Sequence, residues 1–346
     1  MVLLAQGTHP VLGAHSSFWG SASWYYVYFI IAVLFALALD LGVFNRRPHR
    51  ISFREALCWC TLWFSVSMFF AFYTIPFLPF YAEAGSTVAT AKKIEFITGY
   101  ILELSLSMDN VFVIALIFTY FKVKPEHQHR VLFWGIIGAL VMRGLMIGIG
   151  AAAVQRFEWI LYLFGAFLLL TGIKMFFMDD DDGVEPEKNP IVKIARKIFP
   201  VHDKFDEGKF ITVVNGKKLI TPMAIVLITV ESTDVVFAVD SVPAIFAVTT
   251  DPFIVFTSNM CAILGLRSLY FVLASAIDYF HYLKYGLALV LAFIGAKMLS
   301  VHWIEQKWGE IPAWVPLAVV ITILFISMIS SLIFKFQKED TGKNAE

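Results

Sequence analysis

Long apolar segments dominate this sequence. A segment that crosses lipid has no water to bond its backbone, so it must be a helix or part of a closed barrel. A helix needs about 20 residues to cross the hydrocarbon core. Of the 346 residues, 59% are hydrophobic and 16% are charged, against about 25% charged in a soluble domain. We predict an all-α polytopic membrane protein with nine transmembrane helices, at residues 24–44, 57–80, 94–121, 131–154, 157–178, 222–249, 252–277, 280–300 and 312–335.

The basic residues are distributed unevenly over the loops between these helices. One set of alternate loops holds 19 of the 27 Lys and Arg residues, and the other set holds only four. Loops rich in Lys and Arg stay in the cytoplasm. The pattern therefore predicts a multi-pass protein with its N-terminus outside the cell and its C-terminus in the cytoplasm.

Two three-helix units, residues 94–178 and 222–300, share three polar landmarks in the same order. Each unit has an acid in its first helix, an Arg in its second and a Gly-x-Lys-Met sequence in its third. The landmarks are Asp109, Arg143 and Gly172–Met175 in one unit, and Asp240, Arg267 and Gly295–Met298 in the other. Because three is odd, the second unit crosses the membrane upside down. We predict two inverted repeats, which place substrate sites near the bilayer midplane; chance resemblance is the alternative.

The remaining segments flank or join the two repeats. We predict an outer tail (1–23), two peripheral helices (24–80), a cytoplasmic linker (179–221), a last helix (312–335) and a cytoplasmic tail (336–346).

The linker contains three patterns of its own. Residues 191–199 predict a basic amphipathic helix at the membrane surface. Asn215-Gly216 between two apolar runs predicts a β-hairpin. The acidic run Asp179–Asp182 is either a solvated stretch or a collector of cations.

Acidic residues inside membrane helices are costly, and they mark functional sites. Five such acids occur here: Glu103, Asp109, Glu231, Asp234 and Asp240. The helical period puts Glu103, Ser107 and Asn110 on one face, and it puts Glu231, Asp234 and Ser241 on one face of the later helix.

Asp109 and Asp240 each lie six residues after another acid, Glu103 or Asp234. Six helical residues turn through about 600°, so the members of each pair point about 120° apart. They face one cavity only if the helix unwinds locally. Pro243 cannot donate to the carbonyl of residue 239, so we predict a helix break at Asp240-Ser241.

The predicted counter-ions for these acids are Arg143 and Arg267. Five carboxylates against two guanidinium groups leave a negative surplus that a divalent cation would relieve, and crowded carboxylates suit proton coupling. Carboxylate, amide and hydroxyl ligands fit Mg²⁺, Ca²⁺ and Mn²⁺, and Met108 would add a softer ligand favouring Mn²⁺. The alternative is a static network of salt bridges that holds the helices together.

Other functional classes find little support in the sequence. The three Cys residues form no CxxC pair, and there is no Gly-rich phosphate loop, zinc-protease motif or oriented nucleophile–base pair. We expect no enzymatic activity, no permanent cofactor and no nucleic-acid partner; the expected partners are the lipid bilayer and a divalent cation.

Several stretches resemble the TerC family of integral membrane proteins, and its Alx branch in particular. The resemblance spans about residues 24–335, and its most specific parts are the two acidic motifs. The stretches are LALDLGVF (37–44), ELSLSMDNVF (103–112), VVNGKK (213–218), ESTDVVFAVDSVPAIFAV (231–248) and LRSLY (266–270).

The family is associated with tellurite resistance and with manganese export, and the resemblance implies Mn²⁺ export from the cytoplasm across a bacterial inner membrane, by alternating access between the two repeats. It carries over six residues as the metal site: Glu103, Asp109, Asn110, Asp234, Asp240 and Ser241. Glu231, Ser107 and Met108 are additional candidates from the residue pattern. Alx-type members are also called membrane-bound redox modulators, so the alternative is a membrane scaffold, or a redox-modulating or tellurite-resistance protein, whose buried acids are structural.

Overall fold

The computed structural model describes residues 23–39, 52–157, 159–177, 192–194, 197, 200, 209–214, 217–274, 283–308, 312 and 314–343. Its helices are α2 (Ser23–Leu39), α3 (Phe53–Phe69), α4 (Pro79–Ala82), α5 (Ser86–Tyr120), α6 (Pro125–Arg156), α7 (Ile160–Phe177), α9 (Pro222–Phe246), α10 (Pro252–Ala274), α11 (Leu283–Trp308) and α12 (Trp314–Lys343). A π-helical turn (Phe70–Thr74) and a 3₁₀ turn (Ile75–Phe77) continue α3.

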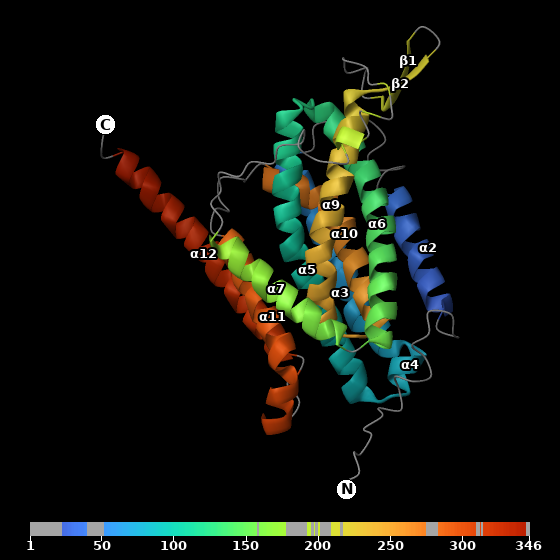
Figure 1. Cartoon of the computed structure of the whole chain (residues 1–346), viewed down its shortest axis with the longest axis vertical. Helices are drawn as coiled ribbons and strands as arrows, with labels where there is room; N and C mark the ends of the chain where they lie inside the picture. Colours follow the sequence, from blue (N-terminus) through green and yellow to red (C-terminus); the bar gives the residue numbers. More distant parts are fainter. Residues whose placement is uncertain are drawn as a thin grey trace.

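The helices form an upright bundle with an inclined group beside it (Figure 1). The bundle consists of α2, α3, α5, α6, α9 and α10, and the inclined group consists of α7, α11 and α12. Helix α10 is the most buried of the candidate membrane spans among the described residues, and it packs against α2, α3, α5 and α6. Helix α4 lies at one end of the bundle, and the hairpin of β1 and β2 lies at the other (Figure 1).

Each of the nine predicted transmembrane segments coincides with a helix. Among the described residues, seven helices are long and apolar enough to cross a membrane: α3 with its two following turns, α5, α6, α7, α9, α10 and α12. Helix α2 is apolar but shorter, and α11 is not among the seven. The polytopic helical class is therefore confirmed, while the count of nine spans stays a prediction.

Helix starts follow local sequence signals. Pro125, Pro222 and Pro252 lie in the first turns of α6, α9 and α10, where the missing N–H costs nothing. Gly85 precedes α5 with a φ of 103°, a conformation that side chains disfavour. Helix α12 continues to Lys343, so most of the tail predicted at 336–346 is helical.

The predicted helix break at Asp240-Ser241 is wrong. Helix α9 is continuous from Pro222 to Phe246, with Pro243 inside it. Every side chain from Ser241 to Phe246 is buried, so neighbouring helices hold this turn in place. Pro243 lies three residues before the last helical residue, Phe246, and its carbonyl still accepts from Ala247 N at 3.1 Å. Packing thus outweighs the single hydrogen bond that the proline removes.

The structure contains a β-hairpin in the linker, at the place that the sequence predicted. Strand β1 (Ile211–Val214) pairs antiparallel with β2 (Lys217–Ile220), with Ile211 opposite Ile220. The turn residues Asn215 and Gly216 lie outside the described residues, as do the acidic run at 179–182 and most of the amphipathic helix predicted at 191–199.

Helices α7 and α11 cross closely through small residues. A Cβ added to Gly172 would overlap Ala292 N at 2.6 Å and Ala288 O at 2.7 Å. A Cβ added to Gly295 would overlap the backbone at Leu169 N and Gly165 O. Only glycine permits this distance between the backbones at either position.

Candidate functional site: a buried arginine between two acids

Arg143 lies near the middle of α6, and its side chain is completely buried. It forms an ion pair with Glu103 of α5 and a two-pronged pair with Asp234 of α9. In the second pair Nη2 donates to Asp234 Oδ1 at 2.9 Å, and Nε donates to Oδ2 at 3.2 Å. One guanidinium therefore joins three membrane helices, in the fork geometry that Arg favours with carboxylates.

Three polar side chains complete the surroundings of Arg143. Ser107 donates to Glu103 Oε1 at 3.1 Å, and Ser241 Oγ lies 3.5 Å from Arg143 Nη1. The amide of Asn110, oriented by its hydrogen bonds, accepts from Arg143 Nη2 at 3.0 Å and donates to Leu106 O at 3.3 Å. We call Glu103, Ser107, Asn110, Arg143, Asp234 and Ser241 the arginine cluster.

The arginine cluster carries one negative charge in excess, because two carboxylates face one guanidinium. Glu103 is completely buried, and its Oε2 has no hydrogen-bond partner among the described residues. An unsatisfied buried acceptor costs about 1–3 kcal/mol, and more when it is charged. The site thus has an oxygen ligand that its own protein partners leave unused.

A small cavity of about 30 Å³ adjoins the arginine cluster on the side of the hairpin. Glu231, Asp234 and Arg267 contribute its charged side chains. Glu231 lies directly over Gly138 of α6, because a Cβ on Gly138 would overlap its carboxylate. The volume is about that of one water molecule in the liquid. Asp234 therefore connects the buried pair to a space that a small ion or water could occupy.

Arg267 is the second predicted counter-ion, and it lies apart from Arg143. Its Nη1 is 3.1 Å from His129 Nε2 of α6. One helical turn further along α10, Tyr270 donates to Gln128 Oε1 at 3.0 Å. These contacts tie the hairpin end of α10 to the first turns of α6.

Two predicted ligands lie away from the arginine cluster. Asp240 takes a hydrogen bond from Thr171 of α7, which fits the 120° separation from Asp234 on an unbroken helix. Met108 packs against the hydrophobic core, so it serves as a packing residue. The side chain of a further predicted ligand, Asp109, lies outside the described part of the structure.

The described residues contain no group of three or more His, Cys, Asp or Glu side chains placed to hold a metal ion. Glu103 and Asp234 instead share Arg143. The arrangement can hold a cation only if Arg143 gives up part of its contact with these acids.

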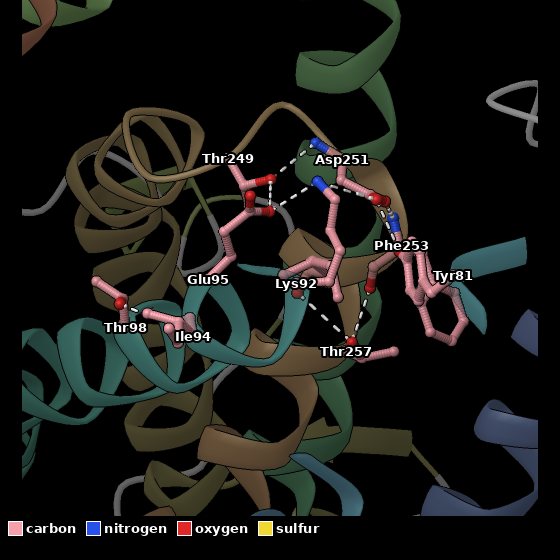
Figure 2. A network of polar contacts seen from close by, with 10 residues as sticks. Tyr81, Lys92, Ile94, Glu95, Thr98, Thr249, Asp251, Phe253 and Thr257 are labelled. Atoms are coloured by element: carbon pink, nitrogen blue, oxygen red, sulfur yellow. Dashed lines mark hydrogen bonds and ion pairs between the residues drawn. The ribbon is translucent and has the colours of Figure 1, made fainter. Parts of the chain in front are cut away.

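A second polar network, which the sequence did not predict, lies at the α4 end of the bundle (Figure 2). It joins α4, the first turns of α5 and the turn between α9 and α10 through five side chains: Tyr81, Lys92, Glu95, Thr249 and Asp251. Asp251 caps α10 by accepting from Phe253 N at 3.1 Å. An Asp-Pro pair before an apolar run is the sequence signal that could have found the cap.

Tyr81 of this network stays protonated over the physiological range. Burial, and then the neighbouring Asp251 carboxylate, raise the pKa of Tyr81 well above its usual value. Tyr81 therefore remains a hydrogen-bond donor to Asp251 Oδ2, at 2.6 Å.

Membrane-length helices around a buried ion-pair cluster define an integral membrane protein with a charged core. The sequence profile of the integral membrane protein TerC family matches residues 88–339. The chain belongs to this family, as its acidic motifs predicted.

Named relatives cover most of the chain. An uncharacterized membrane protein of Myxococcus xanthus is 46% identical over 88% of this chain and 91% of its own length. A protein of Escherichia coli K12, provisionally named membrane-bound redox modulator Alx, is 45% identical over 87% of this chain and 92% of its own length. A Salmonella typhi protein with the same name is 44% identical over 90% and 94%. No solved structure matches the chain.

Proposed function

We propose that this protein is a secondary transporter that exports a divalent metal cation, Mn²⁺, across the bacterial inner membrane. The observation that carries the proposal is Arg143, which is buried in a membrane helix and paired with an acid from each predicted repeat. Glu103 and Asp234 hold matching positions, because each lies six residues before the central acid of its unit. Charges buried in a membrane protein commonly line substrate and ion pathways.

Contacts between matching positions support the inverted repeats. Gly172 and Gly295 are the glycines of the two Gly-x-Lys-Met sequences, and each approaches the backbone of the other unit. Gly172 contacts Ala288 and Ala292, and Gly295 contacts Gly165 and Leu169. The two sets of contacts correspond, because Gly172 and Gly295, Gly165 and Ala288, and Leu169 and Ala292 are each 123 positions apart. Likewise, α5 packs on α10, and α9 packs on α6. This reciprocity is what a two-fold relation between the units requires.

Arg143 would act as a tethered cation in the transport cycle. With no substrate bound, its guanidinium neutralises Glu103 and Asp234, and the empty carrier avoids burying two bare carboxylates. A divalent cation reaching the cavity beside Glu231 would compete for Asp234, and then for the unused oxygen of Glu103. Displacement of Arg143 would be the local change that biases one repeat against the other.

The ligand chemistry supports a hard cation. Carboxylate, amide and hydroxyl oxygens are the ligands of the arginine cluster, and they suit Mg²⁺, Ca²⁺ and Mn²⁺. The choice of Mn²⁺ rests on the resemblance of the acidic motifs to a family associated with manganese export. Export from the cytoplasm as the direction of transport rests on the same resemblance. The orientation, with the N-terminus outside and the C-terminus inside, rests on the basic loops.

The test is Mn²⁺ flux into proteoliposomes that contain the purified protein. We expect Glu103→Gln and Asp234→Asn to reduce flux at least tenfold, because each removes a ligand and leaves Arg143 without one partner. Glu126→Gln is the matched control, since Glu126 is exposed in the first turn of α6. Equal flux in all three variants would refute the proposal.

Redox modulation, the function in the names of the Alx relatives, finds less support in the thiols. Cys58 is exposed and Cys60 is partly buried on α3, while Cys261 is buried on α10. Cys58 and Cys60 are two residues apart on one helix and do not face each other. The alternative of a scaffold with structural acids predicts that Glu103→Gln lowers the amount of folded protein but leaves Mn²⁺ binding unchanged.

A further inference from the structure

The network at the α4 end plays no part in the proposed cation site. It lies at the opposite end of the bundle from the hairpin (Figure 1). Helix α5 is 35 residues long, or about 50 Å at 1.5 Å per residue, against about 30 Å of hydrocarbon. Helix α5 is thus longer than the lipid core is thick, and Lys92 and Glu95 lie in its first three turns with their side chains partly exposed.

Lys92 stands between two carboxylates from different parts of the chain (Figure 2). Its Nζ is 2.8 Å from Glu95 Oε2 and 3.5 Å from Asp251 Oδ2. Thr249 donates to the same Glu95 oxygen at 2.5 Å, and Tyr81 donates to Asp251 at 2.6 Å. Two of these contacts join α5, in the first repeat, to the turn between α9 and α10, in the second.

Tight packing lies directly beneath the network. Gly99 of α5 faces Ser258 of α10, and a Cβ on Gly99 would come within 2.8 Å of Ser258 Oγ. Thr98, Thr257 and Ser258 are all completely buried there. Helices α5 and α10 are thus in direct contact between the network and the arginine cluster. The hairpin side of the arginine cluster has the cavity lined by Glu231 and Asp234.

We propose that Lys92, Glu95, Thr249, Asp251 and Tyr81 form a gate, closed in this structure, between the cation site and the α4 side of the membrane. The gate rests on the proposed function, since alternating access requires one end to close while the other opens. Its ion pairs are partly exposed, with 15–19% of each side chain accessible. In pairs that are mostly buried, the desolvation cost offsets much of the attraction between the charges, and the remaining exposure lets water reach them when the gate opens.

The charges of the gate predict how the loss of Lys92 shifts the equilibrium between its closed and open states. Without Lys92, the carboxylates of Glu95 and Asp251 would face each other with no cation between them. Like charges repel, and the repulsion would act across the boundary between the repeats. Loss of Lys92 therefore favours the open gate over the closed one.

The experiment measures access to the packed region beneath the gate. Cys58, Cys60 and Cys261 are replaced by Ala, and Ser258→Cys serves as the reporter. Sealed vesicles that expose the α4 side are treated with a membrane-impermeant maleimide, and the rate of alkylation is measured. We expect Lys92→Met to raise this rate about tenfold, equivalent to ~1.4 kcal/mol.

Lys93→Met is the matched control, because Lys93 contacts the ring of Phe72 at 5.1 Å and takes no part in the gate. Equal alkylation rates in Lys92→Met and Lys93→Met would overturn the gate. If Lys92→Met does not accumulate, Thr249→Val and Tyr81→Phe each remove one hydrogen bond to a gate carboxylate, and unchanged rates in both would overturn it.

Alkylation needs no metal, so the gate and the cation site can fail separately. Unchanged alkylation in a protein that passes the Mn²⁺ flux assay would overturn the gate alone. Faster alkylation in a protein that carries no Mn²⁺ would support the gate and refute the proposed substrate.

Discussion

Replacing Arg143 with Met tests the physical role of the arginine cluster most directly. The variant would leave Glu103 fully buried with no cation and Asp234 with no partner from α6. Removing one member of a buried ion pair costs about 3–5 kcal/mol. Since the total stability of a folded protein is about 5–15 kcal/mol, we expect a large loss in the free energy of unfolding.

Arg143→Lys keeps the charge but loses the two-pronged contact with Asp234. Its free energy of unfolding should therefore lie between those of the wild type and Arg143→Met. The double variant Arg143→Met with Glu103→Gln removes the buried charge left behind by the single change. It should therefore be more stable than Arg143→Met alone, although it carries one more substitution. This non-additivity is the signature of a coupled pair.

The assay is SDS-induced unfolding of the purified protein in mixed micelles. Arg156→Met is the matched control, because Arg156 ends the same helix, is exposed and lies 5.7 Å from the ring of Phe157. Such an exposed contact contributes about 0.5–1 kcal/mol. If Arg143→Met costs no more than Arg156→Met, the buried-pair reasoning is refuted.

Three further predictions follow from close contacts and from one titrating group. Gly138→Ala should weaken Mn²⁺ binding without lowering the stability of the protein, because its Cβ displaces only the flexible end of Glu231. Gly148→Ala is the control: its Cβ meets open space, so Mn²⁺ binding should be unchanged and the stability unchanged or slightly higher. Calorimetric titration would measure the binding. Gly295→Ala should cost at least about 2 kcal/mol of unfolding free energy, because its Cβ meets backbone that cannot move aside. The pKa of Tyr81 is higher in the folded state than in the unfolded state. The stability that comes from this difference is therefore fully present below about pH 10, the usual pKa of tyrosine, and is lost as the pH rises above that value. Thermal unfolding between pH 8 and 11 should show this loss, and Tyr81→Phe should flatten it.

The faces of the acidic helices were predictable from sequence. The spacing of Glu103, Ser107 and Asn110 put them on one side of α5, and all three lie in the arginine cluster. Asp234 and Ser241 likewise lie together beside Arg143. Helical period is a local property, so it needs no knowledge of the neighbours.

The conformation at Asp240 was not predictable in the same way. Pro243 is a local signal for a break, yet α9 passes through it unbroken because its last turn is buried on all sides. Asp240 therefore keeps its helical direction and bonds to Thr171 of α7. Whether a helix continues through a proline depends on how helices distant in sequence pack around that turn. The proline in the sequence gives no information about that packing.

The sequence by itself determined the membrane class, the helices and the side of each helix that carries charge, because these follow from hydropathy and from the period of the helix. Only the tertiary structure decided the partners. It gave Arg143 both acids, turned Arg267 toward His129 and joined Lys92 to Asp251, which are 159 positions apart. Which charges meet depends on how helices distant in sequence pack together, and no local pattern encodes that packing.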